Sequence, residues 1–155
     1  MQYIRSRFVL HRPPLECEEQ VLLPGRFEKL AELRANGHRI GIATNQSAVA
    51  HGAIALEEAE ALVLNCIAKI GGASAWRLSP YDPRAKKQLD GKPNPFARDD
   101  ETRKPRPGMV LQLMQELNVS PADTFMVGDR KMDKKCAQAA GVTFLDEKEF
   151  FKFNK

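Results

Sequence analysis

The chain has 155 residues, of which 43% are hydrophobic and 28% are charged, and its net charge is +4. This composition is typical of a globular domain and excludes a disordered, collagen-like or low-complexity chain. No apolar run reaches the ~18–20 residues that a membrane span needs, and no apolar signal-peptide core follows Arg5 and Arg7. We therefore expect a single domain, residues 1–155, that is cytoplasmic and has no membrane partner.

Strands and helices are expected to alternate along the chain. In chain order the expected elements are a strand at 3–10, a helix from Pro24 to Asn36, a strand at 39–44, a helix at 56–70, a strand at 75–78, a helix from Pro107-Gly108, a strand at 124–127, a helix at 131–140, a strand at 142–145 and a terminal helix at 147–153. This alternation predicts an α/β fold with a mainly parallel sheet.

The apolar spacing of two helices predicts their buried faces. Phe27, Leu30 and Leu33 recur every third residue in the first helix. In the helix after Pro107 the side chains expected to point inward are Val110, Leu111, Met114 and Leu117.

A long segment between the third strand and the third helix lacks any periodicity. Residues 79–103 form a proline-rich loop in this prediction, and a structureless stretch of that length is usually functional or disordered. Between residues 84 and 106 lie eight Lys or Arg and four Asp or Glu, so the local excess equals that of the whole chain. The excess favours an anionic ligand, either a phosphorylated small molecule or a nucleic acid; a solvated loop explains the charge equally well.

The cysteines give no sign of a disulfide or a metal site. Cys17, Cys66 and Cys136 are scattered and form no C-x-x-C pair. We expect reduced thiols, and Cys66 and Cys136 as packing residues.

Polar residues follow the strands where a parallel sheet binds its ligands, at the carboxyl edge. They are Thr44 and Asn45 after the second strand, Arg103 and Lys104 before the third helix, and Asp129 and Asp133 after the fourth strand. A hydroxyl, an amide, two cations and two carboxylates suit a phosphate group and Mg²⁺. Taken singly, each is also explained as turn or helix-start chemistry.

The sequences of three segments, and their order along the chain, resemble the motifs of the haloacid dehalogenase superfamily. The matching segments are IATNQSAVAHG at 42–52, RKPRPGM at 103–109 and MVGDRKMD at 126–133, with Ala139–Gly141 behind them. Within the superfamily the chain resembles the histidinol-phosphate and heptose-bisphosphate phosphatases, over residues 3–146. The resemblance implies a Rossmann-like sheet with helices on both faces and no large cap domain.

The resemblance also implies roles for site residues. Thr44, Asn45, Arg103 and Lys104 would bind phosphate, and Asp129 and Asp133 would bind Mg²⁺, with Lys104 and Asp129 also serving catalysis. His51, near the end of the first of these segments and close to the expected ligand, is a candidate substrate contact.

The first motif of the family does not match. The family has two aspartates, two residues apart, after the first strand; this chain has His11 and Pro13 there. Without the aspartate no aspartyl-phosphate forms, and proline offers no proton to a leaving group. His11 as a phosphoryl acceptor, or a glutamate at position 16, 18 or 19, stays open as a replacement.

A second departure concerns zinc. Many relatives carry a Cys/His zinc loop before the segment that matches Arg103-Lys104, but residues 79–103 contain neither residue type. We expect no zinc, and a loop held by prolines, ion pairs or a partner protein.

Two functions follow. One is a phosphate-binding, HAD-type protein with impaired catalysis and weakened Mg²⁺ binding. The alternative is an active Mg²⁺-dependent phosphomonoester phosphatase, acting on a sugar phosphate or a nucleic acid end, with a replacement nucleophile or a site completed by a partner chain.

Overall fold

The computed structural model describes residues 4–6 and 14–152, so His11 and Pro13 lie outside the described residues. In chain order the elements are β1 (Ile4–Ser6), the 3-10 helix η1 (Cys17–Glu19), β2 (Gln20–Leu22), α1 (Arg26–Ala35), β3 (Gly41–Asn45), α2 (Leu56–Lys69), β4 (Ala75–Ser79), β5 (Gln88–Leu89), β6 (Lys92–Pro93), α3 (Gly108–Leu117), the 3-10 helix η2 (Pro121–Asp123), β7 (Phe125–Gly128), α4 (Lys131–Ala140), β8 (Thr143–Asp146) and α5 (Glu147–Phe150). No helix in these ranges is both long and apolar enough to cross a membrane.

Two parallel strand pairs form the centre of the molecule. Strand β3 pairs with β4, to which α2 connects it, and β7 pairs with β8 through α4. The predicted α/β fold with parallel strands is confirmed, and the described residues include no large cap domain. The described strands form four two-stranded ladders, however, not one continuous sheet. A largely apolar cavity of about 460 Å³ lies between β3 and β7, bounded by Gly41 and Ala43 on one side and residues 125–127 on the other.

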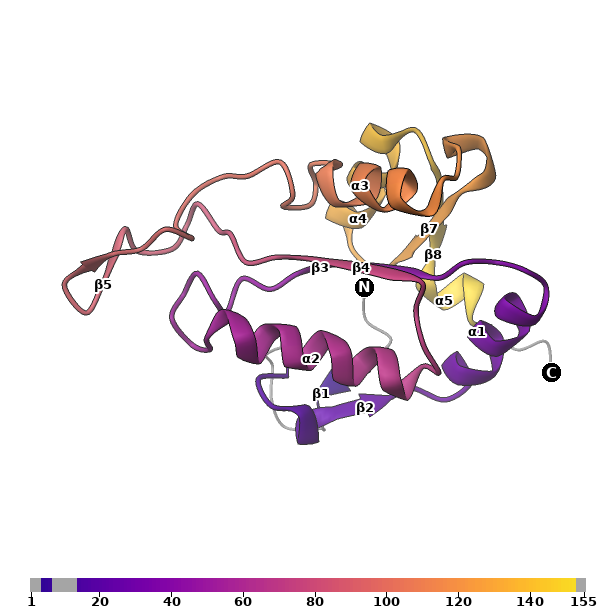
Figure 1. Cartoon of the computed structure of the whole chain (residues 1–155), viewed down its shortest axis with the longest axis horizontal. Helices are drawn as coiled ribbons and strands as arrows, with labels where there is room; N and C mark the ends of the chain where they lie inside the picture. Colours follow the sequence, from indigo (N-terminus) through magenta and orange to yellow (C-terminus); the bar gives the residue numbers. More distant parts are fainter. Residues whose placement is uncertain (1–3, 7–13, 153–155) are drawn as a thin grey trace.

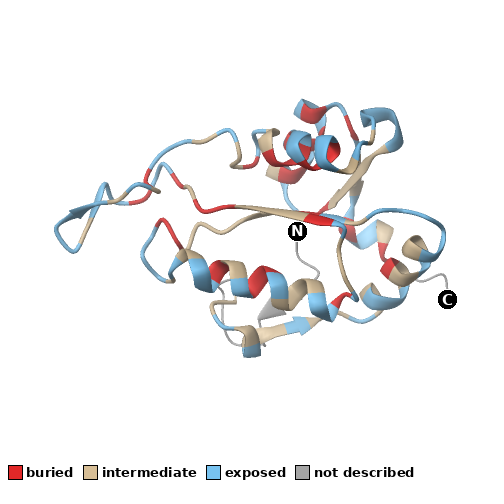
Figure 2. Cartoon of the chain, in the orientation of Figure 1, coloured by how far each residue is buried: buried red, intermediate tan, exposed pale blue. Residues whose placement is uncertain are grey.

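Strand β3 is buried on both faces. Helix α2 lies on one side of the β3–β4 pair, and α3 and α4 lie on the other (Figure 1). Successive side chains of the strand enter different cores: Ile42 packs with Leu30 and Val63, whereas Ala43 belongs to the cluster formed by α3 and α4. The buried residues accordingly lie along β3 and β4 and on the inner faces of the helices (Figure 2). This two-sided packing fixes the strand end that carries Thr44 and Asn45.

The amino-terminal part differs from the prediction. Of the expected strand at 3–10, the described residues Ile4–Ser6 form β1, which pairs antiparallel with β2. Strand β2 was not predicted, because three residues directly after an acidic stretch carry too little apolar pattern to stand out. Residues 7–10 lie outside the described residues.

Two side chains expected in the core are exposed. Phe27 is 46% exposed and Leu111 47% exposed. Phe27 lies in the first turn of α1, and Leu30 is the buried residue of that helix. In α3 the buried positions are Met109, Val110, Leu113 and Met114. Leu111 lies about 100° around the helix from Val110, outside that face.

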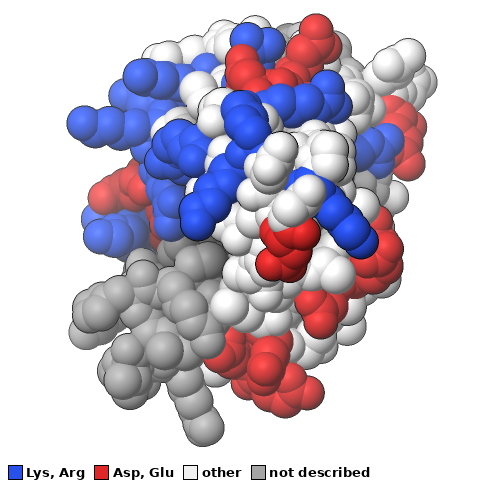
Figure 3. All heavy atoms as spheres, turned by 90° about the vertical axis from the view of Figure 1, so that its left-hand side faces the viewer, with Lys and Arg blue, Asp and Glu red and all other residues white. Residues whose placement is uncertain are grey.

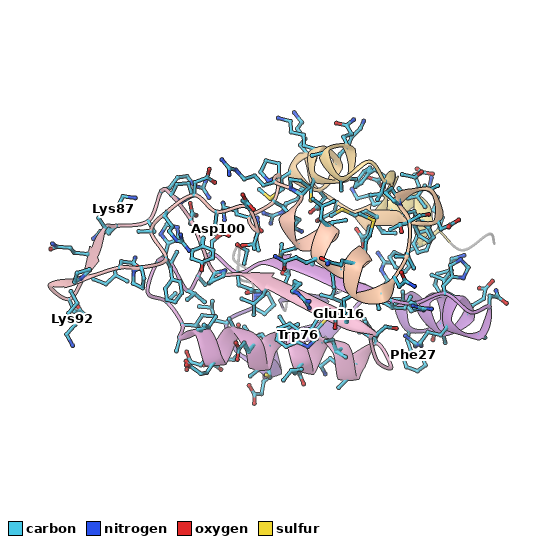
Figure 4. All side chains as sticks on the ribbon, turned by 45° about the horizontal axis from the view of Figure 1, so that its top comes forward. Phe27, Trp76, Lys87, Lys92, Asp100 and Glu116 are labelled. Atoms are coloured by element: carbon cyan, nitrogen blue, oxygen red, sulfur yellow. The ribbon has the colours of Figure 1, made fainter. Side chains whose placement is uncertain are left out.

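The loop at 79–103 contains a short hairpin that was not predicted. Strands β5 and β6 pair antiparallel across Asp90 and Gly91, whose φ angles are +50° and +74°. Asp-Gly is a favoured pair for such a two-residue turn, so the signal was present in the sequence. The hairpin projects from the body of the molecule (Figure 1), and it carries Lys92, with Lys87 directly before β5 (Figure 4).

Candidate functional site

A cavity of about 310 Å³ lies at the carboxyl end of β3. Thr44, Asn45 and Ser47 line it from the strand and the turn that follows, and Arg84, Arg103 and Lys104 line it from the long loop. Further lining residues come from α2 and from the start of α4, namely Leu62, Val63, Cys66, Arg130, Met132 and Asp133. The three segments that suggested the family therefore meet around one space.

Lys104 and Asp133 form a buried ion pair in the wall of this cavity. The Lys104 ammonium lies 2.6 Å from Asp133 Oδ1, with the two side chains only 3% and 2% exposed. The ammonium also donates to the carbonyl oxygen of Ala43, at 3.2 Å. These contacts use two of its three donors. Burial raises the pKa of Asp133, but the nearby positive charge, including Lys104, and its hydrogen bonds outweigh burial and hold this pKa below its usual range.

The second oxygen of Asp133 caps helix α4. It accepts hydrogen bonds from the backbone N–H groups of Arg130, at 3.1 Å, and of Asp129, at 3.3 Å. Gly128 makes room for this arrangement, because a Cβ atom there would stand 2.5 Å from Asp133 Cβ. Both Asp133 oxygens thus bind protein groups, which makes Asp133 a residue that positions Lys104 and the start of α4.

Asn45 fixes the backbone of Lys104. Its amide nitrogen donates to the Lys104 carbonyl and its amide oxygen accepts from the Lys104 N–H, both at 3.0 Å. Beside it, the Thr44 hydroxyl oxygen accepts a hydrogen bond from the Gln46 amide at 3.1 Å. A hydroxyl that accepts still has its own proton to donate, so Thr44 keeps a donor for a ligand.

Arg103 is held in the cavity wall by two neighbours. Its guanidinium donates to the Ser47 hydroxyl at 2.7 Å and to the Tyr81 carbonyl at 2.8 Å. The side chain is 11% exposed, and its other terminal nitrogen lies 3.7 Å from Asp82 Oδ2. Arg103 therefore presents a fixed positive charge to the cavity.

Asp82 is a buried carboxylate that sequence reasoning missed. It receives hydrogen bonds from Arg84 and His51, and the Arg84 bonds, with His51 and Arg103 adding to them, hold its pKa well below the usual range despite the burial. The only local signal was an Asp two residues before an Arg in a Pro-containing turn, which is common turn chemistry.

The base of the loop is closed by hydroxyl groups and ion pairs. The Thr102 hydroxyl hydrogen-bonds the Ser79 hydroxyl at 3.0 Å and the Asp100 carboxylate at 2.7 Å. Arg98 lies over the Tyr81 ring, 4.4 Å from its centroid, and pairs with Asp100 at 3.2 Å. Within residues 4–6 and 14–152, no three metal-binding side chains gather. Hydroxyls and ion pairs thus hold the loop.

Asp129 follows β7, with Arg130 and Asp133 on the cavity side of it. It is not among the described residues that line the cavity. Both Asp133 oxygens are engaged by Lys104 and the backbone. The Asp129 carboxylate is a hard oxygen donor of the kind that binds Mg²⁺. Mg²⁺ is often held by one or two carboxylates, with waters and substrate phosphate completing its shell. Asp129 thus supplies a Mg²⁺-type ligand next to the cavity, directly before Arg130, which lines it.

Cys66 lines the same cavity but is a poor nucleophile. Burial raises the pKa of its thiol to about 11. The thiolate is the reactive form, so Cys66 stays inert at neutral pH, in line with a packing role.

Positive side chains gather on the end of the molecule from which the hairpin projects (Figure 3). Within residues 84–106 the exposed Lys and Arg side chains are Arg84, Lys86, Lys87, Lys92, Arg98 and Arg106. The expected patch is thus present, continuous with the cavity through Arg84.

Comparison with known proteins identifies the superfamily. Residues 101–145 match a family described as HAD-hydrolase-like. Over 136 residues the chain is 29% identical to the D-glycero-beta-D-manno-heptose-1,7-bisphosphate 7-phosphatase of Pasteurella multocida, covering 82% of this chain and 67% of that protein. The corresponding protein of Yersinia pestis is 30% identical over 131 residues, covering 82% of this chain and 66% of that protein.

The chain belongs to the haloacid dehalogenase superfamily. Within the superfamily it falls in the heptose-bisphosphate phosphatase group, and it spans about two thirds of the length of these relatives.

Solved structures of HAD proteins agree with this assignment. The heptose 1,7-bisphosphate phosphatase of B. bronchiseptica, solved with magnesium and phosphate, is 28% identical and superimposes with a TM-score of 0.67 over 84% of this chain and 68% of that one. A putative HAD-like phosphatase of Mesorhizobium loti, 24% identical, shares the fold with a TM-score of 0.71 over 83% of this chain and 61% of its own.

Proposed function

We propose that this HAD protein is a single domain that binds a phosphate group in the cavity of about 310 Å³ and that its catalysis is impaired. One observation carries the binding proposal. Lys104 is locked between Asn45 and Asp133, with a donor left over, beside the Thr44 hydroxyl and the Arg103 guanidinium. Fixed donors that converge on one small space are the chemistry that binds an oxyanion.

The proposed loss of catalysis rests on the sequence before β2. His11 and Pro13 stand where the family has its nucleophile and its general acid. General acid catalysis is typically worth about 10²–10⁴ in rate, and without a carboxylate the usual covalent intermediate does not form. Binding survives these changes, since two negative charges no longer oppose the anion.

The same two substitutions also lower the affinity for Mg²⁺, because they remove carboxylates. We propose that Asp129 holds Mg²⁺ only together with bound phosphate, because Asp133 is already used by Lys104 and the α4 backbone. When bound, Mg²⁺ would neutralise phosphate charge, while Lys104, Arg103 and Thr44 orient the group.

The ligand that we favour is a phosphorylated sugar. The support is similarity to proteins named as heptose-1,7-bisphosphate 7-phosphatases. A phosphorylated nucleic acid end is the second possibility, supported by the exposed cations along residues 84–106.

Phosphate titration tests the binding proposal. Inorganic phosphate should raise the melting temperature and give a saturable calorimetric signal, with about 2.7 kcal/mol of stabilisation at a hundredfold excess over Kd. Thr44→Val should weaken this binding, while Thr143→Val, at an exposed position of β8, should leave it unchanged. A wild-type protein that ignores phosphate but responds to Mg²⁺ alone would make this a metal site instead.

Turnover tests the second half of the proposal. With Mg²⁺ and phosphomonoesters, we expect a rate far below the ~1–10³ s⁻¹ of ordinary enzymes, and a higher rate when His11→Asp and Pro13→Asp are combined. Ordinary turnover that Asp129→Asn abolishes would establish the active phosphatase, the candidate favoured by retention of Lys104 and Asp129. His11→Ala would then tell whether His11 is the acceptor.

A further inference from the structure

Asp82 stands at the junction of three segments that surround the cavity. It follows β4 in the long loop, and its side chain is completely buried. Arg84 comes from the same turn, His51 from the turn after β3, and Arg103 from the stretch before Lys104. The Asp82 carboxylate thus contacts His51, which lies 31 residues before it in the chain, and Arg103, which lies about twenty residues after it.

The contacts of Asp82 with Arg84 have the geometry of a fork. Arg84 Nε donates to Oδ1 at 3.1 Å and Arg84 Nη2 donates to Oδ2 at 2.9 Å, while the Arg84 backbone N–H also donates to Oδ1, at 3.0 Å. Such paired bonds hold the guanidinium plane in one orientation. The Arg84 side chain is nevertheless 73% exposed, so its outer face stays open to solvent.

Oδ2 of Asp82 also receives His51 Nε2 at 3.0 Å and lies 3.7 Å from Arg103 Nη2. Arg84 and Arg103 both line the cavity, whereas Asp82 itself does not appear in its lining. The carboxylate therefore lies behind the two guanidinium groups, where it fixes their orientation without facing the ligand.

We propose that Asp82 is the positioning residue of this cavity, holding Arg84 and Arg103 in the orientation in which they receive an anionic ligand. The inference rests on the proposed function, phosphate binding in the cavity, and adds Arg84 to the groups that bind the anion. An exposed arginine without a partner would lose side-chain entropy each time it bound an anion. Because the paired bonds to Asp82 already restrict the Arg84 side chain, Arg84 loses less entropy when the ligand binds.

A purely electrostatic view makes the opposite prediction. If Asp82 acted only through its charge, its loss would strengthen the positive field in the cavity, and the anion would bind more tightly. If Asp82 only fastened the loop, its effect would be independent of Arg84. The two alternatives can be separated from positioning by a double-mutant cycle.

The experiment measures the calorimetric Kd of inorganic phosphate for the full chain at fixed ionic strength. Asp82→Asn should weaken binding about tenfold, the loss of one oriented charged hydrogen bond, and Arg84→Ala by a similar factor. The double variant should bind much less weakly than the product of the two single effects predicts, because most of the Asp82 effect passes through Arg84 and only the remainder through Arg103. Asp99→Asn is the matched control, since Asp99 lies in the same loop and pairs with Arg106; it should change Kd less than about twofold.

Four results would overturn the inference. Tighter binding by Asp82→Asn would favour the electrostatic view, and multiplying effects in the double variant would favour a loop fastener. If the wild type binds phosphate but Arg84→Ala binds equally well, the positioning inference fails alone. If the wild type does not bind phosphate, the proposed function fails and the inference fails with it.

A second variant keeps the test valid if Asp82→Asn does not fold. Arg84 is exposed, so Arg84→Lys should fold, yet a lysine cannot make two parallel bonds to the carboxylate. Arg84→Lys should therefore weaken phosphate binding nearly as much as Arg84→Ala does. Binding by the lysine variant at the wild-type level would contradict a role for the fork.

Discussion

Two buried aspartates shape the two sides of the cavity, and they differ in what surrounds them. Asp133 faces a lysine that is itself buried, between β3 and the start of α4, where both elements are packed into cores. Asp82 faces two arginines and a histidine from loops, and only Arg103 among them is largely buried. One carboxylate thus lies within the packed body, and the other lies where loop segments meet.

Because of this difference, substitutions near Asp133 and substitutions near Asp82 should affect different properties of the protein. Breaking a buried pair leaves an uncompensated charge in the interior, which is costly to the fold. An exposed arginine that loses its carboxylate is solvated at once and costs the fold little. We therefore expect changes on the Asp133 side to reduce stability, and changes on the Asp82 side to alter the loop and the ligand.

The largest effect is expected for Asp133→Ala. It leaves the Lys104 ammonium buried without its carboxylate and removes the cap of α4, so the free energy of unfolding should fall by about 3–5 kcal/mol. Urea denaturation measures this. Glu149→Ala, which breaks the exposed pair with Lys152, is the control and should cost less than about 1 kcal/mol. Equal losses in the two variants would remove the distinction between buried and exposed pairs.

Gly128→Ala should come next. Its Cβ would lie 2.5 Å from Asp133 Cβ, so β7 or α4 must shift, at a cost of about 1–3 kcal/mol. Gly41→Ala, on β3, is the matched control, since its nearest neighbour would be a Leu113 methyl group at an ordinary 3.6 Å. If both variants melt at the same temperature, the close approach of Gly128 to Asp133 does not constrain the fold.

Acid should remove the stabilisation that Asp82 and Asp133 give the folded chain. The pKa values of Asp82 and Asp133 are lowered in the folded chain, so the unfolded chain binds more protons as the pH falls. Their stabilisation is complete above the unfolded value of about 3.9 and is lost as the pH drops through the lower folded values. The difference in stability between wild type and Asp82→Asn should therefore begin to shrink as the pH falls below about 4 and vanish only below the lowered pKa of Asp82. Denaturation at a series of pH values checks this, and a gap that widens in acid would reverse the sign.

A smaller effect is expected at the base of the loop. Thr102→Val keeps the side-chain shape and removes the hydroxyl that bonds Ser79 and Asp100. The free energy of unfolding should fall by about 0.5–1.5 kcal/mol. Thr143→Val on exposed β8 serves as the control, and hydrogen exchange should show faster opening of the loop only in the Thr102 variant.

The smallest effect, none at all, is expected from zinc removal. The loop carries no cysteine or histidine, and hydroxyls and ion pairs close its base. A zinc chelator should therefore leave the melting temperature unchanged. A fall on chelation, restored by zinc, would show that a metal holds the loop after all.

The sequence predicted the body of the molecule better than its edges. Helices α2 and α4 and strands β3, β4, β7 and β8 lie where apolar periodicity put them, because each buries a regular stripe against neighbours. The β5–β6 hairpin and β2 were missed, since two or three residues do not make a periodic pattern. Phe27 and Leu111 were predicted to point inward from the apolar spacing, but both are exposed.

By itself, the sequence determined the chemistry available at the carboxyl edge of β3: a hydroxyl, an amide, two cations and two carboxylates in family order. It also determined that His11 and Pro13 follow the first expected strand and that residues 79–103 contain no cysteine or histidine. These statements depend only on which residue types the chain contains and on their order along it.

Only the tertiary structure decided which groups hold one another. Asn45 binds the Lys104 backbone, Asp133 divides its oxygens between Lys104 and α4, and Asp82 joins three segments that the chain keeps far apart. Hydrogen bonds across 29 to 59 residues depend on how packed elements align, and no local pattern encodes that alignment. The physical reason is that burial selects partners by geometry in three dimensions, where an unpaired polar group is costly.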